Sequence, residues 1–182
     1  MLIESKEMPL TNGKKVIIRS ATDKDAVSLC LHRYITSSET YFMARYPEEC
    51  SFDVEDMKSR LLTTQNSNCD FMITAFLDDE VIGDLGVTQI RNHIKYRHRA
   101  YMGISVQQQY CNMGLGSAMV EYAVRLAKAN GFEQLELGVF EDNIGAIHLY
   151  EKFGFKKYGV QPRAFKLKDG TYRDELIMVK ML

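Results

Sequence analysis

The sequence predicts an α/β (α+β) fold, in which strands and helices alternate along a chain of 182 residues. Short β-branched and apolar runs with a period of two recur from one end of the chain to the other. Segments with helical periodicity lie between them, and the clearest follows Gly114. No Pro/Ser-rich linker and no internal repeat interrupts this pattern, so we expect a single domain over residues 1–182.

In the first half of the chain, strand-like segments alternate with helical ones. Thr22 and Asp25 approximate a capping box at the start of the first helix, whose apolar stripe (Ala26, Leu29, Cys30, Leu31) continues to Tyr34. Ser38–Cys50 has no clear period and should be irregular. The other expected elements are a strand at Lys15–Ser20, a helix at Asp53–Leu62, two strands at Cys69–Phe76 and Glu80–Ile90 joined by a turn at Asp78-Asp79, and a strand at Arg99–Val106.

The second half begins with the most regular helix of the chain. Its apolar residues are spaced as one buried helix face requires: Leu115, Ala118, Met119, Tyr122, Ala123 and Leu126. Asn130-Gly131 supplies a stop, and the strand that follows at Leu135–Phe140 completes a βαβ crossover. Two further strands are expected near Phe155–Phe165 and Tyr172–Met181, with Asp169-Gly170 as their hairpin turn.

Composition argues against several classes of protein. Lys+Arg 23 against Asp+Glu 24 gives a net charge of -1, so we expect no nucleic-acid partner. No window approaches 18 uninterrupted apolar residues and the N-terminus has no signal pattern, so we expect no membrane association. The cysteines are widely spaced, which argues against a metal site or a disulfide framework and predicts a cytoplasmic protein. They are Cys30, Cys50, Cys69 and Cys111.

The run V-Q-Q-Q-Y-C-N-M-G-L-G-S, from Val106 to Ser117, is the main chemical signal. It leads from a strand through a glycine-bearing turn into the long helix. Successive backbone N–H groups there could hold an anion, because glycine permits close approach and the helix dipole favours negative charge. The residues concerned are Cys111, Asn112, Met113, Gly114, Leu115, Gly116 and Ser117. The same glycines would also suit a tight turn, so this motif alone leaves both interpretations open.

Two other phosphate-binding motifs fit this turn less well. The absence of G-K-[ST] excludes a P-loop. A dinucleotide G-x-G-x-x-G would need glycine where Met119 stands, and it would belong to the first βα unit. A nucleotide-binding oxidoreductase is therefore disfavoured.

A second motif, N-x-x-A-x-x-x-Y-x-x-x-G-F, follows at Asn143, Ala146, Tyr150, Gly154 and Phe155. Taken singly, Asn143 could be only an N-cap and Tyr150 only a core residue. Together with the glycine turn, these residues resemble the GNAT superfamily of N-acetyltransferases. The flanking segments H-R-A-Y-M-G-I-S-V and D-G-T-Y-R-D-E-L-I-M look closest to its bacterial small-molecule or ribosomal-protein-type members.

The resemblance implies a mixed, strongly twisted sheet of about seven strands flanked by helices. Acetyl-CoA would enter a wedge where two central strands splay, with its pyrophosphate on the turn from Cys111 to Ser117. Its pantetheine would pair with the backbone of Ile104, Ser105 and Val106, and Asn143 and Ala146 would contribute from the second motif. Cys111 stands where the family usually has Gln or Arg, a departure that leaves its backbone N–H in place.

The resemblance also implies that Tyr150 protonates the leaving thiolate, while backbone N–H groups stabilise the oxyanion. The general base stays open, because the strand at Arg99–Val106 contains no Asp or Glu where many members have one. The possible substitutes are Asp84, Glu39, Glu141, His98 and His148, and an amine that arrives neutral from solvent is an equal alternative.

The acceptor would be a primary amine of a small molecule, polyamine, amino acid or protein N-terminus. Acidic residues in Ser38–Cys50 (Glu39, Glu48, Glu49) would suit a cationic amine. The basic segment His93–Arg99 could steer CoA phosphates or an anionic substrate, although both segments could simply be solvated. A homodimer is a possible state. The alternative function is a non-catalytic acyl-CoA-binding or sensor module with the same fold.

Overall fold

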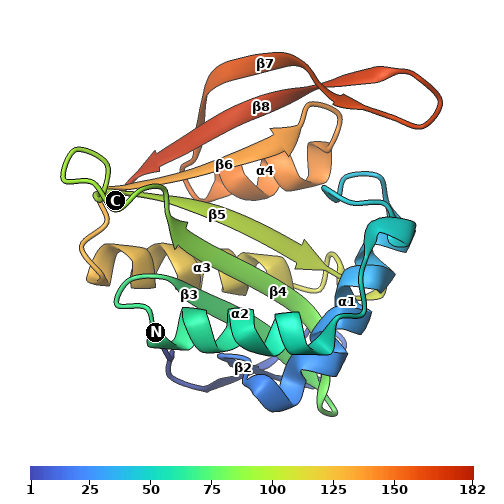
Figure 1. Ribbon diagram of the computed structural model, residues 1–182, viewed down its shortest axis with the longest axis vertical. Coiled ribbons are helices and arrows are strands. Elements are labelled where there is room, and N and C mark those ends of the chain that lie inside the picture. Colours follow the sequence, from blue (N-terminus) through green and yellow to red (C-terminus); the bar gives the residue numbers. More distant parts are fainter. The chain divides into compact units, whose positions relative to one another are not determined.

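The computed structural model describes residues 1–182, which form two compact units (Figure 1). The first unit comprises Met1–Thr88 and Ile104–Met119, and the second comprises Gln89–Gly103 and Val120–Leu182. The strands are β1 (Lys6–Pro9), β2 (Lys15–Arg19), β3 (Phe71–Leu77), β4 (Glu80–Gln89), β5 (Arg99–Val106), β6 (Gln134–Phe140), β7 (Lys156–Lys166) and β8 (Tyr172–Met181). The helices are α1 (Ala26–Glu39), α2 (Val54–Asn66), α3 (Leu115–Ala129) and α4 (Ile144–Lys152).

Hydrogen bonding joins the strands in the order β1-β2-β3-β4-β5-β6-β8-β7, a mixed sheet of eight strands. The pairs β1–β2, β2–β3, β3–β4, β6–β8 and β7–β8 are antiparallel, whereas β5 and β6 are parallel and joined through α3. The mixed sheet and the strand–helix–strand crossover expected from the sequence are confirmed.

In the first unit, a tight hairpin and a helix pair build the core. Asp78 and Asp79 have φ of 51° and 63°, the left-handed conformation that a two-residue hairpin turn between β3 and β4 requires. Helices α1 and α2 bury their apolar faces on this hairpin and exclude water from one contiguous cluster. Its buried members are Ala21, Ala26, Leu29, Cys30, Met57, Leu61, Phe76 and Val81.

The expected capping residues are confirmed, although Thr22 caps a 3-10 turn at Asp23–Asp25 and α1 begins after it, at Ala26. The N–H of Thr22 donates to Asp25 Oδ2 at 2.7 Å. Two nitrogens of the Arg19 guanidinium donate to the two oxygens of the same carboxylate, at 2.7 and 2.8 Å. Asp53 caps α2 by accepting the N–H of Asp56 at 2.9 Å. These bonds satisfy donors that the first turn of a helix otherwise leaves unpaired.

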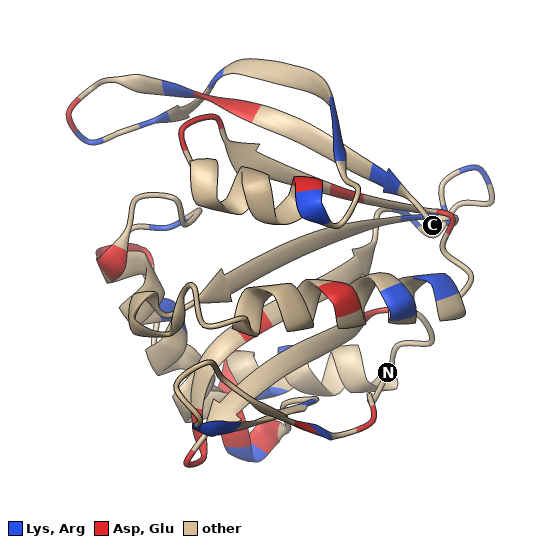
Figure 2. Ribbon diagram, turned by 180° about the vertical axis from the view of Figure 1, so that it is seen from behind, with Lys and Arg blue, Asp and Glu red and all other residues tan.

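Helix α3 connects the two parallel strands β5 and β6. Leu135, Leu137 and Val139 alternate along β6 and are buried, as the period-two pattern predicts. Gly131, two residues after the end of α3, has a φ of 81°, the left-handed conformation that commonly follows the end of a helix. Figure 2 shows that α3 carries its charged residues in its later turns and none where the helix begins.

The structure departs from the sequence predictions at several places, including the end of α2, which lies at Asn66 and not at Leu62. Eight strands are present instead of about seven, because Lys6–Pro9 forms an edge strand that has no apolar alternation to reveal it. Helix α1 continues beyond Tyr34 to Glu39. Leu31 is 45% exposed and is not part of the buried stripe. The stretch expected to be irregular contains one short 3-10 turn at Pro47–Glu49.

We predict that Leu29→Ala lowers the free energy of unfolding by about 2–5 kcal/mol, because it leaves a cavity in the core of the first unit. The matched control on the same helix is Leu31→Ala, whose exposed side chain should contribute no more than about 0.5 kcal/mol. Urea unfolding of both variants measures the difference. Equal losses would show that α1 does not bury the face assigned to it.

Candidate active site

The glycine turn presents backbone donors that nothing in the protein uses. Asn112 and Gly114 have φ of 60° and 87°, and α3 begins directly after them. Cys111 N–H bonds to Gln108 O at 3.1 Å and Ala118 N–H to Gly114 O at 3.0 Å. Between these two bonds, no N–H group from Asn112 to Gly116 makes a hydrogen bond within the protein. The turn therefore offers a row of free donors at a helix N-terminus, which suits an anion.

The electrostatics of α3 leave this end of the helix positive. Its first turn carries no acidic side chain, whereas α2 has Glu55 and Asp56 in its first turn. Acidic residues at that position would neutralise the partial positive charge of the dipole. Their absence from α3 favours an external anion.

Polar anchors from three elements hold the start of the turn. Gln107 is buried, donates through its N–H to Ile82 O at 3.0 Å and through Nε2 to Val81 O at 2.8 Å. Glu39 Oε2, at the end of α1, accepts the N–H of Gln108 at 2.8 Å. Glu39 thus has a structural partner. Sequence reasoning missed Gln107, although a glutamine at the end of an apolar strand is a detectable signal.

The end of β5 is tied to α1 by a buried histidine. His32 is 1% exposed, and its Nε2 lies 2.9 Å from Ser105 Oγ. Burial lowers the pKa of His32 to about 4, so the ring is neutral at pH 7. The Ser105 side chain is therefore occupied, and the backbone of Ile104–Val106 is the part of β5 that could meet a ligand.

In the second unit, Tyr150 is buried and protonated. It is 6% exposed and its ring centroid lies 5.9 Å from that of Phe155. Burial, with a smaller contribution from Tyr101, raises the pKa of Tyr150 to about 12. A phenol that keeps its proton at neutral pH can act as a general acid.

Asn143 caps the helix that carries Tyr150. Its Oδ1 accepts the N–H of Ala146 at 3.2 Å, so the structural interpretation weighed for Asn143 is confirmed. Its Nδ2 group makes no hydrogen bond and is available to a ligand. Gly154, with φ of 81°, ends the helix, and the next residue, Phe155, is buried.

The parallel ladder between β5 and β6 is short. It joins Arg99–Tyr101 to Gln134–Glu136 and does not continue to Met102 or Gly103. Beyond it, the N–H of Gly138 donates instead to the Tyr101 hydroxyl at 2.9 Å. The two strands therefore separate at Tyr101, within the second unit.

The candidate bases differ in their environments. Asp84 is half-buried and accepts Thr74 Oγ1 at 3.0 Å, and burial raises its pKa to about 6. Glu141 accepts the N–H of Asp174 at 3.3 Å, and His148 is exposed. His98 directly precedes β5. The surroundings of these four residues do not identify one of them as the general base.

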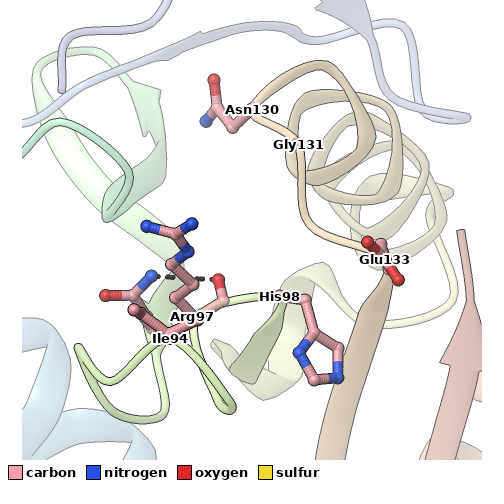
Figure 3. Close-up of a pocket in the computed structure, with 7 residues that line it drawn as sticks. Ile94, Arg97, His98, Asn130, Gly131 and Glu133 are labelled. Atoms are coloured by element: carbon pink, nitrogen blue, oxygen red, sulfur yellow. Dashed lines mark hydrogen bonds between the residues drawn. The ribbon is translucent and has the colours of Figure 1, made fainter.

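An open pocket of about 510 Å³ lies in the second unit, at the far end of β6 from Asn143 (Figure 3). Gln89 Nε2 donates to Arg97 O there at 3.0 Å. Because Tyr150 is not among its lining residues, this pocket is distinct from the predicted site. Those residues are Gln89, Ile94, Arg97, His98, Asn130, Gly131 and Glu133.

Three further observations concern the cysteines, the metal-binding groups and the helices. The four cysteines are free thiols. No group of three or more His, Cys, Asp or Glu side chains is arranged to hold a metal ion. None of the helices combines the length and the apolar character needed to cross a membrane.

Comparison with known proteins decides the family. Residues 31–155 match the model of the Acetyltransferase (GNAT) family. The chain belongs to this family. The resemblance and the fold inferred from the two motifs are thus confirmed, while the assignment of individual site residues stays a prediction.

Individual relatives support this placement. The chain is 29% identical over 110 residues to L-amino acid N-acetyltransferase AaaT of Escherichia coli (strain K12), covering 60% of this chain and 67% of that protein. It spans 45–50% of the length of the other curated relatives. A GNAT-family acetyltransferase from Streptococcus pneumoniae superposes with a TM-score of 0.86 at 30% identity, covering 92% of this chain and 99% of that one.

A third comparison concerns a structure that contains a ligand. The phosphinothricin acetyltransferase (Pat) of Sinorhizobium meliloti, solved in complex with AcCoA, has a TM-score of 0.79 at 23% identity, covering 92% of this chain and 88% of that one. At this identity the likeness shows the fold alone.

We predict that Cys111→Ala leaves acetyl transfer near the wild-type rate, because the backbone at this position and not the sulfur would bind phosphate. Partial desolvation, with Glu39, raises the pKa of the Cys111 thiol, which suits a spectator and not a nucleophile. Steady-state kinetics checks this. Loss of turnover with CoA binding retained would instead indicate an acetyl-cysteine intermediate.

Proposed function

We propose that this protein transfers the acetyl group of acetyl-CoA to a primary amine by direct attack in a ternary complex. The observation that carries the proposal is the row of free N–H groups from Asn112 to Gly116, in a chain of the acetyltransferase family. A protein of the same fold has been solved with AcCoA. We further propose that residues 1–182 act as one catalytic domain.

The cofactor would be held largely by backbone. In the first unit, the turn from Cys111 to Ser117 would bind the pyrophosphate and Ile104–Val106 would pair with the pantetheine. In the second unit, the free Nδ2 of Asn143 and the beginning of α4 at Ala146 would contribute. Backbone donors are present whatever the side chain, so Cys111 does not disqualify the site.

Acetyl-CoA supplies the acetyl group, and the protein supplies proton donors and dipoles. Tyr150 holds its proton at neutral pH and would deliver it to the departing sulfur. The N–H groups at the end of β5 would stabilise the oxyanion that forms on the carbonyl. Neither role needs a charged side chain on β5.

The acceptor that we propose is a molecule or peptide with a primary amine. One relative acts on L-amino acids, and others are named for spermine/spermidine or for the alanine of a ribosomal protein. All of these acceptors present an amine. A panel of amino acids, polyamines and peptide N-termini, assayed with acetyl-CoA, tests the proposal, and the absence of turnover would contradict it.

The alternative is a non-catalytic acyl-CoA-binding module. The observation that favours it is the lack of any carboxylate along β5, where Arg99–Val106 carries none. The presence of Tyr150 at its place in the second motif argues against it, because a binding module needs no proton donor there. CoA binding without turnover over the whole panel would favour the module.

We predict that Gly116→Val weakens CoA binding at least tenfold by blocking approach to the free N–H groups. Gly114 is a poorer test, since its φ of 87° would strain any other residue. The control is Gly159→Val on β7, where the nearest atom to an added Cβ lies 3.9 Å away. Calorimetry measures both variants. Unchanged affinity in folded Gly116→Val would contradict the assigned pyrophosphate position.

We predict that Tyr150→Phe lowers turnover roughly 10²–10⁴-fold, with acetyl-CoA affinity nearly intact. The change removes one proton donor and almost no volume, so the packing against Phe155 should survive. Steady-state kinetics on an acceptor from the panel provides the measurement. Turnover equal to wild type would remove Tyr150 from the mechanism.

A further inference from the structure

Two side chains, Glu175 and Tyr101, meet above Gly138, where β5 and β6 separate. The N–H of Gly138 donates to the Tyr101 hydroxyl at 2.9 Å, so Tyr101 occupies the place of a ladder partner. A Cβ atom at position 138 would overlap the Glu175 carboxylate and would lie 3.1 Å from the Tyr101 hydroxyl oxygen. Only glycine at this position leaves the carboxylate and the hydroxyl side by side.

Glu175 reaches this position from β8, the antiparallel neighbour of β6. It stands opposite Phe140 in the β6–β8 register and opposite Gln161 in the β7–β8 register, so neither strand brings it a charge. The carboxylate makes no ion pair and no hydrogen bond. The titratable groups that face it are the Tyr101 phenol and, through Tyr101, that of Tyr150.

An unpaired carboxylate that is partly removed from water is costly unless it serves a purpose. Burial alone raises the pKa of Glu175, and no cation offsets it. By contrast, the buried carboxylate of Glu136, two residues before Gly138, forms a bidentate ion pair with Arg99. The Glu175 carboxylate is therefore able to bind an external cation or to accept a proton.

We propose that Glu175 is the general base, binding the acceptor's ammonium group above Gly138 and removing its proton. This inference rests on the proposed acetyl transfer and adds to it the acceptor subsite that β5 does not provide. It also restricts the acceptor to a cationic primary amine whose nitrogen can reach the Glu175 carboxylate beside Tyr101. Sequence reasoning did not include Glu175 among the candidate bases.

In the proposed reaction, the ammonium group loses a proton before its nitrogen attacks the acetyl carbon. The ammonium R–NH₃⁺ gives one proton to the Glu175 carboxylate, and the nitrogen lone pair then forms the N–C bond to the acetyl carbon. The C–S bond breaks with its electron pair on sulfur, which takes the Tyr150 proton. The new amide nitrogen returns its surplus proton to the Tyr150 phenolate, and Glu175 releases its proton to water.

The test is the pH dependence of Glu175→Gln, which keeps the shape of the side chain and removes the base. We expect kcat/KM to fall at least 10²-fold at pH 7, with acetyl-CoA affinity unchanged. The deficit should shrink as the pH approaches the pKa of the amine, because the amine then arrives neutral. The acid limb of the wild-type profile, set by the raised pKa of Glu175, should disappear.

A matched control and a second variant keep the test decisive. Glu151→Gln, on the exposed side of the helix that carries Tyr150, changes the charge equally and should behave as wild type. Gly138→Ala displaces the carboxylate without removing it and should also lower kcat/KM. If Glu175→Gln does not fold, Glu175→Asp serves, and it should retain the acid limb at a reduced rate.

The outcomes separate the two proposals. Wild-type turnover combined with an unaffected Gln variant overturns the role of Glu175 alone. A loss of equal size at every pH also overturns it, because such a loss reflects structure and not proton removal. Absence of wild-type turnover over the whole amine panel overturns the acetyl transfer and, with it, this inference.

Discussion

The parallel pairing of β5 with β6 lasts for three residue pairs and then stops, and the chemistry that we propose for the second unit depends on this interruption. If the ladder continued, Gly138 would donate to a backbone carbonyl and no side chain could reach it. Instead the Tyr101 hydroxyl accepts that bond at 2.9 Å, and the Glu175 carboxylate lies directly above the same glycine. A broken ladder exposes backbone groups, and side chains with chemical functions take their place.

The second unit fixes the positions of these groups through bonds between β8 and the turn that precedes α4. Arg173 Nε donates to Asp142 at 2.9 Å, and the N–H of Glu141 donates to Asp174 O at 3.1 Å. These bonds hold the start of α4 against the strand that carries Glu175. Two hydrogen bonds thus join β8 to the turn from which the helix carrying Tyr150 begins. In the first unit, Gln107 and His32 similarly use buried polar bonds to keep backbone donors in place.

Local patterns in the sequence predict most of the fold. The bounds of β5 are as expected, and α3 is recognisable because its apolar residues repeat with the helical period. Lys6–Pro9 was missed because an edge strand with a solvated face carries little alternation. The end of α1 was missed because Thr36 and Ser38 bond back to carbonyls of the preceding turn and remain helical despite weak propensity.

The candidate site is predictable only where its residues are close in sequence. Asn143 and Tyr150 share one short helix, so their spacing reveals them. Glu175 lies 25 positions beyond Tyr150 and belongs to no motif, and only the β6–β8 register brings it over Gly138. Its lack of a partner, which makes it chemically interesting, is a property of three strands together.

The central claim is that backbone donors in the first unit hold acetyl-CoA. Amide hydrogen exchange, followed residue by residue by NMR with and without acetyl-CoA, tests this most directly. We predict that acetyl-CoA slows amide exchange at Ile104–Val106 and from Asn112 to Gly116. Unchanged exchange at both segments, with slowing confined to Asn130–Glu133 beside the other pocket, would contradict it.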